Sequence, residues 1–399
     1  MRRLAFGFLF SFLFTLPLPV GLHAEVLGVC ETGTGIGWLE RSEFGDLILH
    51  LDGSYYDMGF QHGSLLAEEG RHSIRAIRAM IRKARPLIPM LVIEWYLHRF
   101  VYSRQAPHIP TEFKEELRGG AEATGVPLKR IEALHALTYL TSCATSSAWG
   151  PATATGALHF LRSNDTFFSV DPETSTMIQA YGMIVLYRPD EGVPYMMISW
   201  PGYTGASDGM NAEGIAVANM SNPSRYESPA GLPMSFRLKN TLSKARTLDD
   251  AVALMTAEPL GGGYNFLVAD AKIPDARAIE MDAKTVYVGG WDGPAESSQH
   301  TYKGRDYAYT PQEGLLTRTN HPLSSELIAN HKGKIEAGDV DDCRTARRYR
   351  DLRVRLLAGY GALDAEGMNA VMRAHYRAMY QGEGDDCYPS STHQMILSP

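Results

Sequence analysis

The spacing of apolar residues divides the chain into a helical first third and a later part in which strands and helices alternate. Before the helical part, one strand is predicted at 45–52 (GDLILHLD). Residues 54–140 are then mostly helical, because apolar positions recur there with helical spacing. The individual helices are predicted at 64–84, 90–104, 111–124 and 127–140.

After residue 140 the pattern changes to short apolar runs separated by turn residues, which is typical of strands. A hairpin is predicted first, with strands at 144–150 and 157–163 around the turn PATATG. The remaining strands are predicted at 176–187, 194–200, 214–219, 264–269, 277–281 and 285–289, and the helices at 234–244, 248–257, 343–358 and 365–380. The pattern therefore predicts an α+β protein.

The first 24 residues have the pattern of a secretory signal peptide. Arg2 and Arg3 precede an apolar stretch that is broken by prolines and ends in LHA at Ala24. We expect cleavage near Ala24 and export of the chain to a periplasm or to the medium. The sequence contains no second apolar run long enough to span a bilayer, so no stable membrane anchor is expected.

The net charge bears on the class of partner, and the number of cysteines bears on the possible disulfides. The formal net charge is −7 and no basic stripe with interleaved aromatic residues is present, which argues against a nucleic-acid partner. Four cysteines follow the signal: Cys30, Cys143, Cys343 and Cys387. In an exported chain they can form two disulfides. The alternative is one disulfide, between Cys343 and Cys387, with Cys143 kept as a thiol.

The segment 141–165 (TSCATSSAWGPATATGALHFLRSND) favours a reactive Cys143. A cysteine thiol ordinarily has a pKa of about 8.5 and needs a base to react at neutral pH, yet no histidine motif accompanies Cys143. Cleavage between Ser142 and Cys143 would supply one, an α-amino group with a pKa of about 7.7–8.0. The hairpin would bring Arg162 to the thiolate and Asp165 to the amine or substrate. The simpler interpretation of Arg162 and Asp165 is a surface ion pair.

These residues resemble a known family. CATSSAWG (143–150), the ATATG turn and Arg162-Ser163-Asn164-Asp165 resemble the start of the mature chain in the acyl-coenzyme A:6-aminopenicillanic acid acyltransferase family. That family belongs to the autoproteolytic N-terminal nucleophile (Ntn) hydrolases, with choloylglycine hydrolases and acid amidases as relatives. Weaker similarities are found at 54–69, 207–222, 264–271, 318–322 and 344–354 and in the closing STHQMILSP.

The resemblance implies a fold and a division of the chain. The fold is a four-layer αββα Ntn-hydrolase sandwich preceded by a mostly helical pro-region. The implied parts are a signal peptide at 1–24, a pro-region or alpha chain at 25–142, and a catalytic region or beta chain at 143–399. The precursor would cut itself between Ser142 and Cys143, and the two chains would stay associated.

The resemblance also implies roles for individual residues. Cys143 matches the autoproteolytic nucleophile, and Arg162 and Asp165 match the residues that position it and the new amine. Asn219 is the best match to the strand asparagine that supplies an oxyanion-hole donor, with Asn222 as the alternative if the register differs. Asn320 resembles a second active-site asparagine, and Arg348 resembles a late supporting arginine.

The function implied is hydrolysis of linear N-acyl amides through a cysteine acyl-enzyme, with acyl transfer to an amine as a further activity. The expected partner is a small-molecule N-acyl or acyl-thioester substrate, and no metal or organic cofactor is needed. Two alternatives remain open at this point. One is a lipid-ester hydrolase of the phospholipase B-like type, and the other is a non-catalytic exported binding protein with Cys143 in a disulfide.

Overall fold

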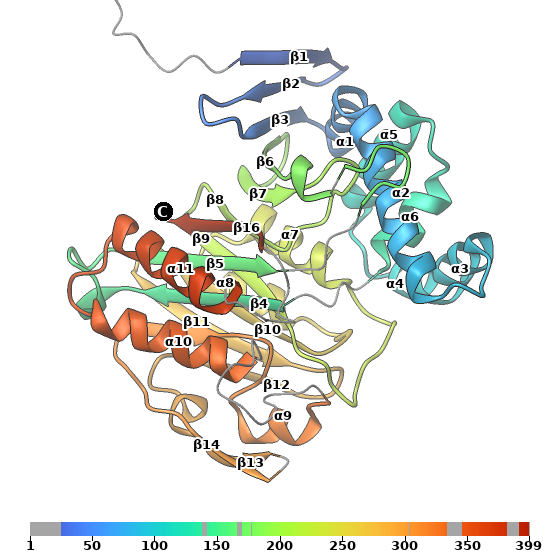
Figure 1. Ribbon diagram of the computed structural model, residues 1–399. Coiled ribbons are helices and arrows are strands. Elements are labelled where there is room, and N and C mark those ends of the chain that lie inside the picture. Colours follow the sequence, from blue (N-terminus) through green and yellow to red (C-terminus); the bar gives the residue numbers. More distant parts are fainter. Residues whose placement is uncertain are drawn as a thin grey trace, which may run out of the picture.

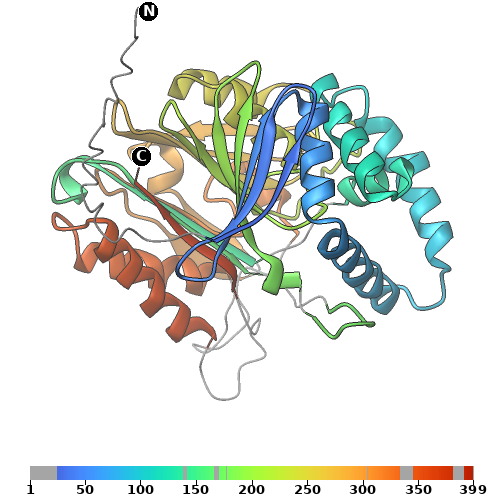
Figure 2. The ribbon, with the colours of Figure 1, turned by 90° about the horizontal axis from the view of Figure 1, so that it is seen from above.

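Two β-sheets lie face to face in the computed structural model, and helices cover the outer face of each (Figures 1 and 2). The structure describes residues 25–137, 142–165, 170–176, 178–302, 304–332, 345–380 and 391–398. Within this part of the chain, no helix is both long enough and apolar enough to cross a membrane.

The larger sheet has the strand order β1-β2-β3-β6-β7-β8-β9-β10-β11-β12. Its strands are β1 (Glu25–Glu31), β2 (Ile36–Arg41), β3 (Leu47–Gly53), β6 (Met183–Pro189), β7 (Tyr195–Ser199), β8 (Asp208–Asn211), β9 (Ile215–Ser221), β10 (Tyr264–Asp270), β11 (Asp275–Met281) and β12 (Val286–Gly289). Neighbouring strands are antiparallel except β3 and β6, which are parallel. That parallel pair joins the first strands of the chain to the rest of the sheet.

The smaller sheet contains the first and the last strand of the chain after residue 141. Its order is β15-β4-β5-β16, and its strands are β15 (Leu315–Arg318), β4 (Ser142–Ala148), β5 (His159–Asp165) and β16 (Ser391–Leu397). The predicted hairpin is thus present as β4 and β5, which pair from Ser142–Asp165 to Ala148–His159. Outside both sheets, β13 (Gln299–Tyr302) and β14 (Arg305–Ala308) form a separate hairpin.

Alternation along the strands separates three apolar layers. Ala144 of β4 packs with Leu352 and other residues of helices α10 (Thr345–Ala358) and α11 (Ala365–Tyr380). Phe160 of β5 packs with Ala218 of β9 between the two sheets. Val217 packs on the far side with helices α7 (Met234–Lys244) and α8 (Leu248–Thr256). The layers therefore run helix–sheet–sheet–helix, which confirms the expected αββα sandwich.

The remaining helices gather at one end of the larger sheet (Figure 1). They are α1 (Tyr55–Leu65), α2 (Ala67–Ala84), α3 (Met90–Tyr96), a π-helical turn (Leu97–Tyr102), α4 (Ser103–Gln105), α5 (Thr111–Thr124) and α6 (Leu128–His135). A short helix, α9 (Ser325–Asn330), lies near the β13–β14 hairpin. The helical character expected for 54–140 is present as far as His135, where α6 ends, and residues 138–140 lie outside the described residues.

Several elements differ from the sequence-based expectation. Helix α1 was not predicted from the sequence, because Gly59 and Gly63 suggest a loop. A Cβ on Gly59 would lie 2.0 Å from the carbonyl oxygen of Glu116, and one on Gly119 would lie 2.1 Å from that of Tyr56. These glycines therefore allow α1 and α5 to pack backbone to backbone. The strands β1, β2, β8 and β13–β16 and helix α9 were also missed, and 176–187 contains a 3₁₀ turn (Ile178–Tyr181) before β6 begins.

Candidate active site

Cys143 lies near the start of β4, on the face of the smaller sheet that is turned toward the larger one. It pairs across the hairpin with Asn164 of β5. Its neighbour Ala144 faces the outer helices, whereas Thr145, two residues on, donates a hydrogen bond to the sulfur of Met220 in β9 at 3.0 Å. Cys143 shares the face of Thr145 because side chains alternate along a strand. It is fully buried.

Arg162 connects Cys143 to an acidic residue of the larger sheet. One guanidinium nitrogen donates to the sulfur of Cys143 at 3.3 Å, and Nε donates to Oδ2 of Asp208 at 3.1 Å. A further nitrogen donates to the carbonyl oxygen of Ser163 at 2.9 Å. Burial acts to lower the pKa of Arg162, but Cys143 and Asp208 hold that pKa above its usual value. The guanidinium is therefore a fixed positive charge beside the thiol.

Asp165 and Asn164 lie on opposite faces of β5. The Asn164 amide oxygen lies 3.7 Å from the sulfur of Cys143. Asp165 shares the other face with Ser163, whose hydroxyl donates to the carboxylate at 2.7 Å. Asp165 pairs with Ser142 in the β-ladder, so its position is next to the Ser142–Cys143 peptide bond.

Asn320 and Arg348 hold the backbone of Cys143. The amide N–H of Cys143 donates to Oδ1 of Asn320 at 2.6 Å, and Arg348 donates to the Cys143 carbonyl oxygen at 2.6 Å. Arg348 also donates to Oδ1 of Asn320 at 2.8 Å. The Asn320 amide nitrogen donates to the backbone oxygen of Ser221 at 2.8 Å and to its hydroxyl at 3.1 Å. Residues 177 positions apart in the chain thus meet at one peptide unit.

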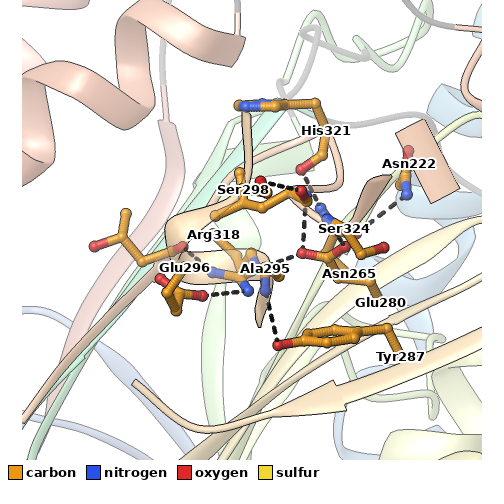
Figure 3. A network of polar contacts seen from close by, with 12 residues as sticks. Asn222, Asn265, Glu280, Tyr287, Ala295, Glu296, Ser298, Arg318, His321 and Ser324 are labelled. Atoms are coloured by element: carbon orange, nitrogen blue, oxygen red, sulfur yellow. Dashed lines mark hydrogen bonds and ion pairs between the residues drawn. The ribbon is translucent and has the colours of Figure 1, made fainter. Parts of the chain in front are cut away.

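A buried ionic network fixes the segment that carries Asn320 (Figure 3). Arg318 donates to Glu280 at 2.8 Å and is paired with Glu296 at 2.5 Å, and all three side chains are buried. Glu280 also accepts the backbone N–H groups of Leu323 and Ser324, both at 2.9 Å. Burial acts to lower the pKa of Arg318, but the two glutamates raise it above its usual value. The network therefore clamps both ends of the segment 318–324.

Asn265 of β10 completes this clamp on either side of Asn320. Its amide nitrogen donates to the carbonyl oxygens of Thr319 at 2.9 Å and His321 at 2.7 Å. Its amide oxygen accepts a hydrogen bond from Asn222 at 3.1 Å (Figure 3). Because the carbonyls before and after Asn320 are both held, the direction of the Asn320 side chain is fixed from the larger sheet.

The two candidates for the strand asparagine have different surroundings. Asn219 is opposite Phe266 in the β-ladder, and Phe266 packs toward α7 and α8. The side-chain oxygen of Asn219 is buried and has no hydrogen-bond partner among the described residues. Asn222 is bonded to Asn265 and accepts a hydrogen bond from His331 at 2.6 Å. The described contacts join neither side chain directly to Cys143, so the oxyanion-hole role of Asn219 stays a prediction.

A cavity of about 360 Å³ opens beside Ser221, on the α7 side of the larger sheet. Such a volume is within the range of small-molecule sites. Its apolar wall includes Met234, Phe266 and Met281, and Val101 and Gln105 reach it from the helical first part of the chain. The Gln105 amide oxygen is buried without a hydrogen-bond partner in the described structure. The wall of the cavity is therefore mixed, with apolar side chains beside polar ones that include Gln105, Glu227 and Arg237.

The described residues test only part of the predicted disulfide pairing. Cys30 lies in the edge strand β1 and is not joined to Cys143 by a disulfide. Cys343 and Cys387 lie outside the described residues, so the predicted bridge between them stays a prediction. Among the described residues, no group of three or more His, Cys, Asp or Glu side chains is placed to hold a metal ion.

The structure therefore brings together Cys143, Arg162, Asn320 and Arg348, and it sets Asp165 beside the same peptide bond. Sequence reasoning missed Asn164, Asp208, Ser221 and Asn265. All four lie within segments already singled out, and strand alternation would have placed Asn164 on the Cys143 face. Ser221 and Asn265 carry no signal of their own, because their roles come from contacts between distant segments.

Two curated proteins are similar to this chain over most of its length. Over 393 residues it is 23% identical to an uncharacterised protein of Archaeoglobus fulgidus, covering 91% of this chain and 63% of that protein. It is 25% identical over 332 residues to protein dcd1B of Dictyostelium discoideum, covering 73% of this chain and 64% of that protein. The chain thus spans a little under two thirds of the length of these curated relatives.

Among solved structures, 64% of the chain aligns with an N-acylethanolamine-hydrolysing acid amidase orthologue of Caenorhabditis elegans, at 14% identity, a TM-score of 0.43 and 92% coverage of that chain. The penicillin V acylase of Agrobacterium tumefaciens aligns over the same share, at 15% identity, a TM-score of 0.40 and 80% coverage. A conjugated bile acid hydrolase mutant of Clostridium perfringens gives 10% identity, a TM-score of 0.36 and 86% coverage.

The family comparison gives the clearest match. Residues 163–338 match the family model described as acyl-coenzyme A:6-aminopenicillanic acid acyl-transferase. Asp165, Asn219 and Asn320 lie within the matched residues, and Cys143 and Arg348 lie on either side of them. Through residues 163–338, a little under half of its length, this chain is similar to the acyl-coenzyme A:6-aminopenicillanic acid acyl-transferase family.

Proposed function

We propose that the protein is an exported amide hydrolase of the Ntn type, with Cys143 as nucleophile and new amino terminus. The observation that carries the proposal is the pair of contacts at Cys143. Its sulfur accepts a hydrogen bond from Arg162 at 3.3 Å, and its backbone nitrogen donates to Asn320 at 2.6 Å. A thiol beside a fixed cation and a backbone nitrogen with its own acceptor suit a residue whose sulfur and nitrogen both react.

The first step would cut the precursor. The sulfur of Cys143 attacks the carbonyl carbon of Ser142, the new C–S bond forms, and the peptide C–N bond breaks. The thiol proton moves to that nitrogen, which already carries one hydrogen and so becomes a primary amine. Water then hydrolyses the thioester, which frees the Ser142 carboxyl group and regenerates the Cys143 thiol. In this proposal Asp165, whose ladder partner is Ser142, holds the new amino group.

The second step would act on the substrate. The α-amine of Cys143 takes the thiol proton, and the thiolate attacks the amide carbonyl carbon. The oxyanion needs a donor, for which the hydroxyl of Ser221 and the amide of Asn219 are the candidates. The leaving amine departs with the proton from the Cys143 α-amine. Water resolves the acyl-enzyme by hydrolysis, and an acceptor amine would resolve it by acyl transfer.

The supporting residues would act by holding the nucleophile. Arg162 stabilises the thiolate, and Asp208 keeps Arg162 in place through the contact at 3.1 Å. Arg348 and Asn320 fix the Cys143 backbone on both of its polar groups. This leaves the nucleophile with little conformational freedom to lose during the reaction.

The cavity beside Ser221 suits the acyl group of the substrate. It is bounded by residues on both sides of the proposed cleavage point, such as Gln105 before it and Phe266 after it. A cut between Ser142 and Cys143 would leave this wall intact only if both chains stay together. We therefore propose an associated pair, with a signal peptide at 1–24, an alpha chain at 25–142 and a beta chain at 143–399.

The test is the intact mass of the purified protein under denaturing conditions, beside the Cys143→Ala variant and a Cys30→Ala control. We expect two fragments that meet at Ser142–Cys143 in the wild type and in Cys30→Ala, and an uncut chain in Cys143→Ala. An uncut wild type whose Cys143 resists alkylation would refute the mechanism and favour the binding protein.

A substrate panel separates the amide reaction from the lipid-ester alternative. N-acyl amides and glycerophospholipid esters with the same acyl chains are compared on the wild type and on Cys143→Ala. We expect Cys143-dependent release of amine from the amides. Cys143-dependent turnover of the esters alone would replace the amide proposal with a lipid-ester hydrolase.

A further inference from the structure

A contiguous group of large apolar side chains is exposed where α2 leads into α3. The group, which we call the apolar tip, consists of Leu87, Ile88, Leu91, Val92, Trp95 and Tyr96. Their exposed fractions are 94%, 43%, 68%, 48%, 59% and 54%. Single exposed apolar residues are ordinary on a protein surface, but a contiguous group marks an interaction site.

The geometry of α3 explains why these side chains face outward together. Leu91, Val92, Trp95 and Tyr96 are spaced so that they share one side of the helix. The other side is fixed inward by Met90 and Glu94, both buried, and Glu94 is paired with Arg78 at 3.0 Å and with Arg130 at 3.2 Å. In Figure 1, α3 lies at the outer end of the helical region, away from the sheets. The apolar tip is thus held outward by ionic contacts on its inner side.

The residues that flank the apolar tip are basic. Between 82 and 104 the chain has five lysines or arginines and one acidic residue, Glu94. Arg82, Lys83, Arg85, Arg99 and Arg104 are exposed, whereas the carboxylate of Glu94 is already neutralised by its arginines. Glu132 lies nearby but is bonded to His98 at 3.0 Å. The tip therefore carries local positive charge on a protein whose net charge is −7.

Aromatic residues are gathered at the same place. The rings of Trp95 and Tyr96 each lie 5.3 Å from that of Phe100, and the guanidinium of Arg99 lies 5.5 Å from the Phe100 ring centre. Tryptophan and tyrosine favour the boundary between lipid headgroups and acyl chains, and basic residues favour anionic headgroups. Exposed apolar and aromatic residues with basic flanks are typical of segments that lie in a membrane interface.

We propose that the apolar tip docks this protein reversibly onto an anionic lipid surface. The apolar and aromatic side chains enter the interfacial layer, and the basic residues contact the headgroups. A second copy of the chain suits the tip less well, because two tips would bring ten exposed lysine and arginine side chains together, five from each copy. The proposal does not depend on the catalytic activity.

The test is co-sedimentation of the full-length protein with vesicles of phosphatidylcholine, alone or mixed with phosphatidylglycerol, at low and high salt. We expect binding to the mixed vesicles that weakens as salt rises. Leu91→Ser/Trp95→Ser should lower the partition coefficient about tenfold or more, because two apolar side chains no longer enter the interface. Arg82→Glu/Lys83→Glu/Arg85→Glu should remove the preference for anionic vesicles.

The matched control is Phe44→Ser, which removes an apolar side chain that is 84% exposed in the turn between β2 and β3. It should bind vesicles as the wild type does. Equal loss of binding in Phe44→Ser and Leu91→Ser/Trp95→Ser, with unchanged thermal unfolding, would overturn the proposal. It would also fall if the wild type ignored anionic vesicles, or if sedimentation showed a dimer abolished by Leu91→Ser/Trp95→Ser without vesicle binding.

Discussion

Lys239 of α7 and Glu116 of α5 form a fully buried ion pair, with the ammonium nitrogen 2.7 Å from one carboxylate oxygen. The ammonium also donates to the carbonyl oxygen of Thr204 at 2.8 Å, and Tyr187 donates to Glu116 at 2.9 Å. Burial lowers the pKa of Lys239 and raises that of Glu116. The pair joins the helices before the proposed cleavage point to the sandwich after it.

The ion pair gives the first prediction. Lys239→Met should destabilise the protein by about 3–5 kcal/mol, because it leaves the Glu116 carboxylate buried without its cation. The double variant Glu116→Leu/Lys239→Met should recover most of that loss. Urea unfolding of the wild type, both single variants and the double variant checks this. A double variant less stable than Lys239→Met would show that the pair itself is not the source of the effect.

Arg162 is expected to act on the thiol rather than on the fold alone. Arg162→Lys keeps the charge but loses the planar fork that contacts Cys143, Asp208 and Ser163. We expect kcat/KM for an N-acyl amide to fall about 10- to 100-fold, the usual worth of one hydrogen bond to a charged group. A matched Arg277→Lys change on β11, where the arginine pairs with Asp275 at 2.7 Å, should leave the rate unchanged. Equal rates for both variants would exclude the role given to Arg162.

Asn265 is a positioning residue for Asn320. Asn265→Asp removes both donors to the carbonyls that flank Asn320 while keeping the side-chain shape. We expect slower self-cleavage, and a loss of stability of about 1–3 kcal/mol from the unsatisfied buried groups. Mass spectrometry over time measures the cleavage, and thermal unfolding measures the stability. Asn369→Asp on α11 is the control, and normal cleavage in Asn265→Asp would contradict the positioning role.

The histidines His62 and His135 predict sensitivity to acid. Burial lowers the pKa of His62 to about 3 and that of His135 to about 4. Nε2 of His62 accepts the N–H of Gly202 at 3.0 Å, and Nε2 of His135 accepts that of Thr204 at 3.1 Å. Both rings must be neutral for these contacts. The unfolded chain, with a histidine pKa of about 6.5, binds more protons below that pH.

Stability should therefore fall as the pH drops from about 6.5 toward 4, by at most about 1.4 kcal/mol per pH unit for each histidine. His62→Gln keeps an acceptor for Gly202 and cannot be protonated. Urea unfolding at several pH values should show a shallower slope in this variant, by up to one proton. His108→Gln, at a histidine that is only half-buried, serves as control. Identical slopes in the wild type and His62→Gln would contradict the prediction.

The site residues that could be predicted from the sequence lie in short motifs that resemble those of a known family. The segment 143–165 indicated Cys143, Arg162 and the hairpin that joins them, because a hairpin brings residues near in the sequence together. Asn320 and Arg348 were reached by resemblance, since nothing in their neighbouring residues shows that they meet Cys143. Ser221 and Asn265 were not reached, because their function depends on how the two sheets stack.

The secondary structure was likewise predictable only where it depends on the local sequence pattern. Helices α5 and α10 follow from their apolar spacing. The strand β1 does not, because Val26, Leu27 and Val29 are all exposed and give no alternation between a buried and an open face. Pairing with β2 sets this strand, and pairing is not visible in a single segment. Likewise Gly59 suggests a loop until its contact with Glu116 is known.

The parallel pairing of β3 with β6 has a consequence for making the protein. The seven residue pairs from Leu47–Met183 to Gly53–Pro189 cover one side of β6. A catalytic region produced alone, from Cys143 onward, would leave β6 as an exposed edge strand. Its unpaired backbone N–H and C=O groups could then pair with strands of other molecules. Recombinant expression of that region by itself should give inclusion bodies, whereas co-expression with the first 142 residues should yield material that remains in solution.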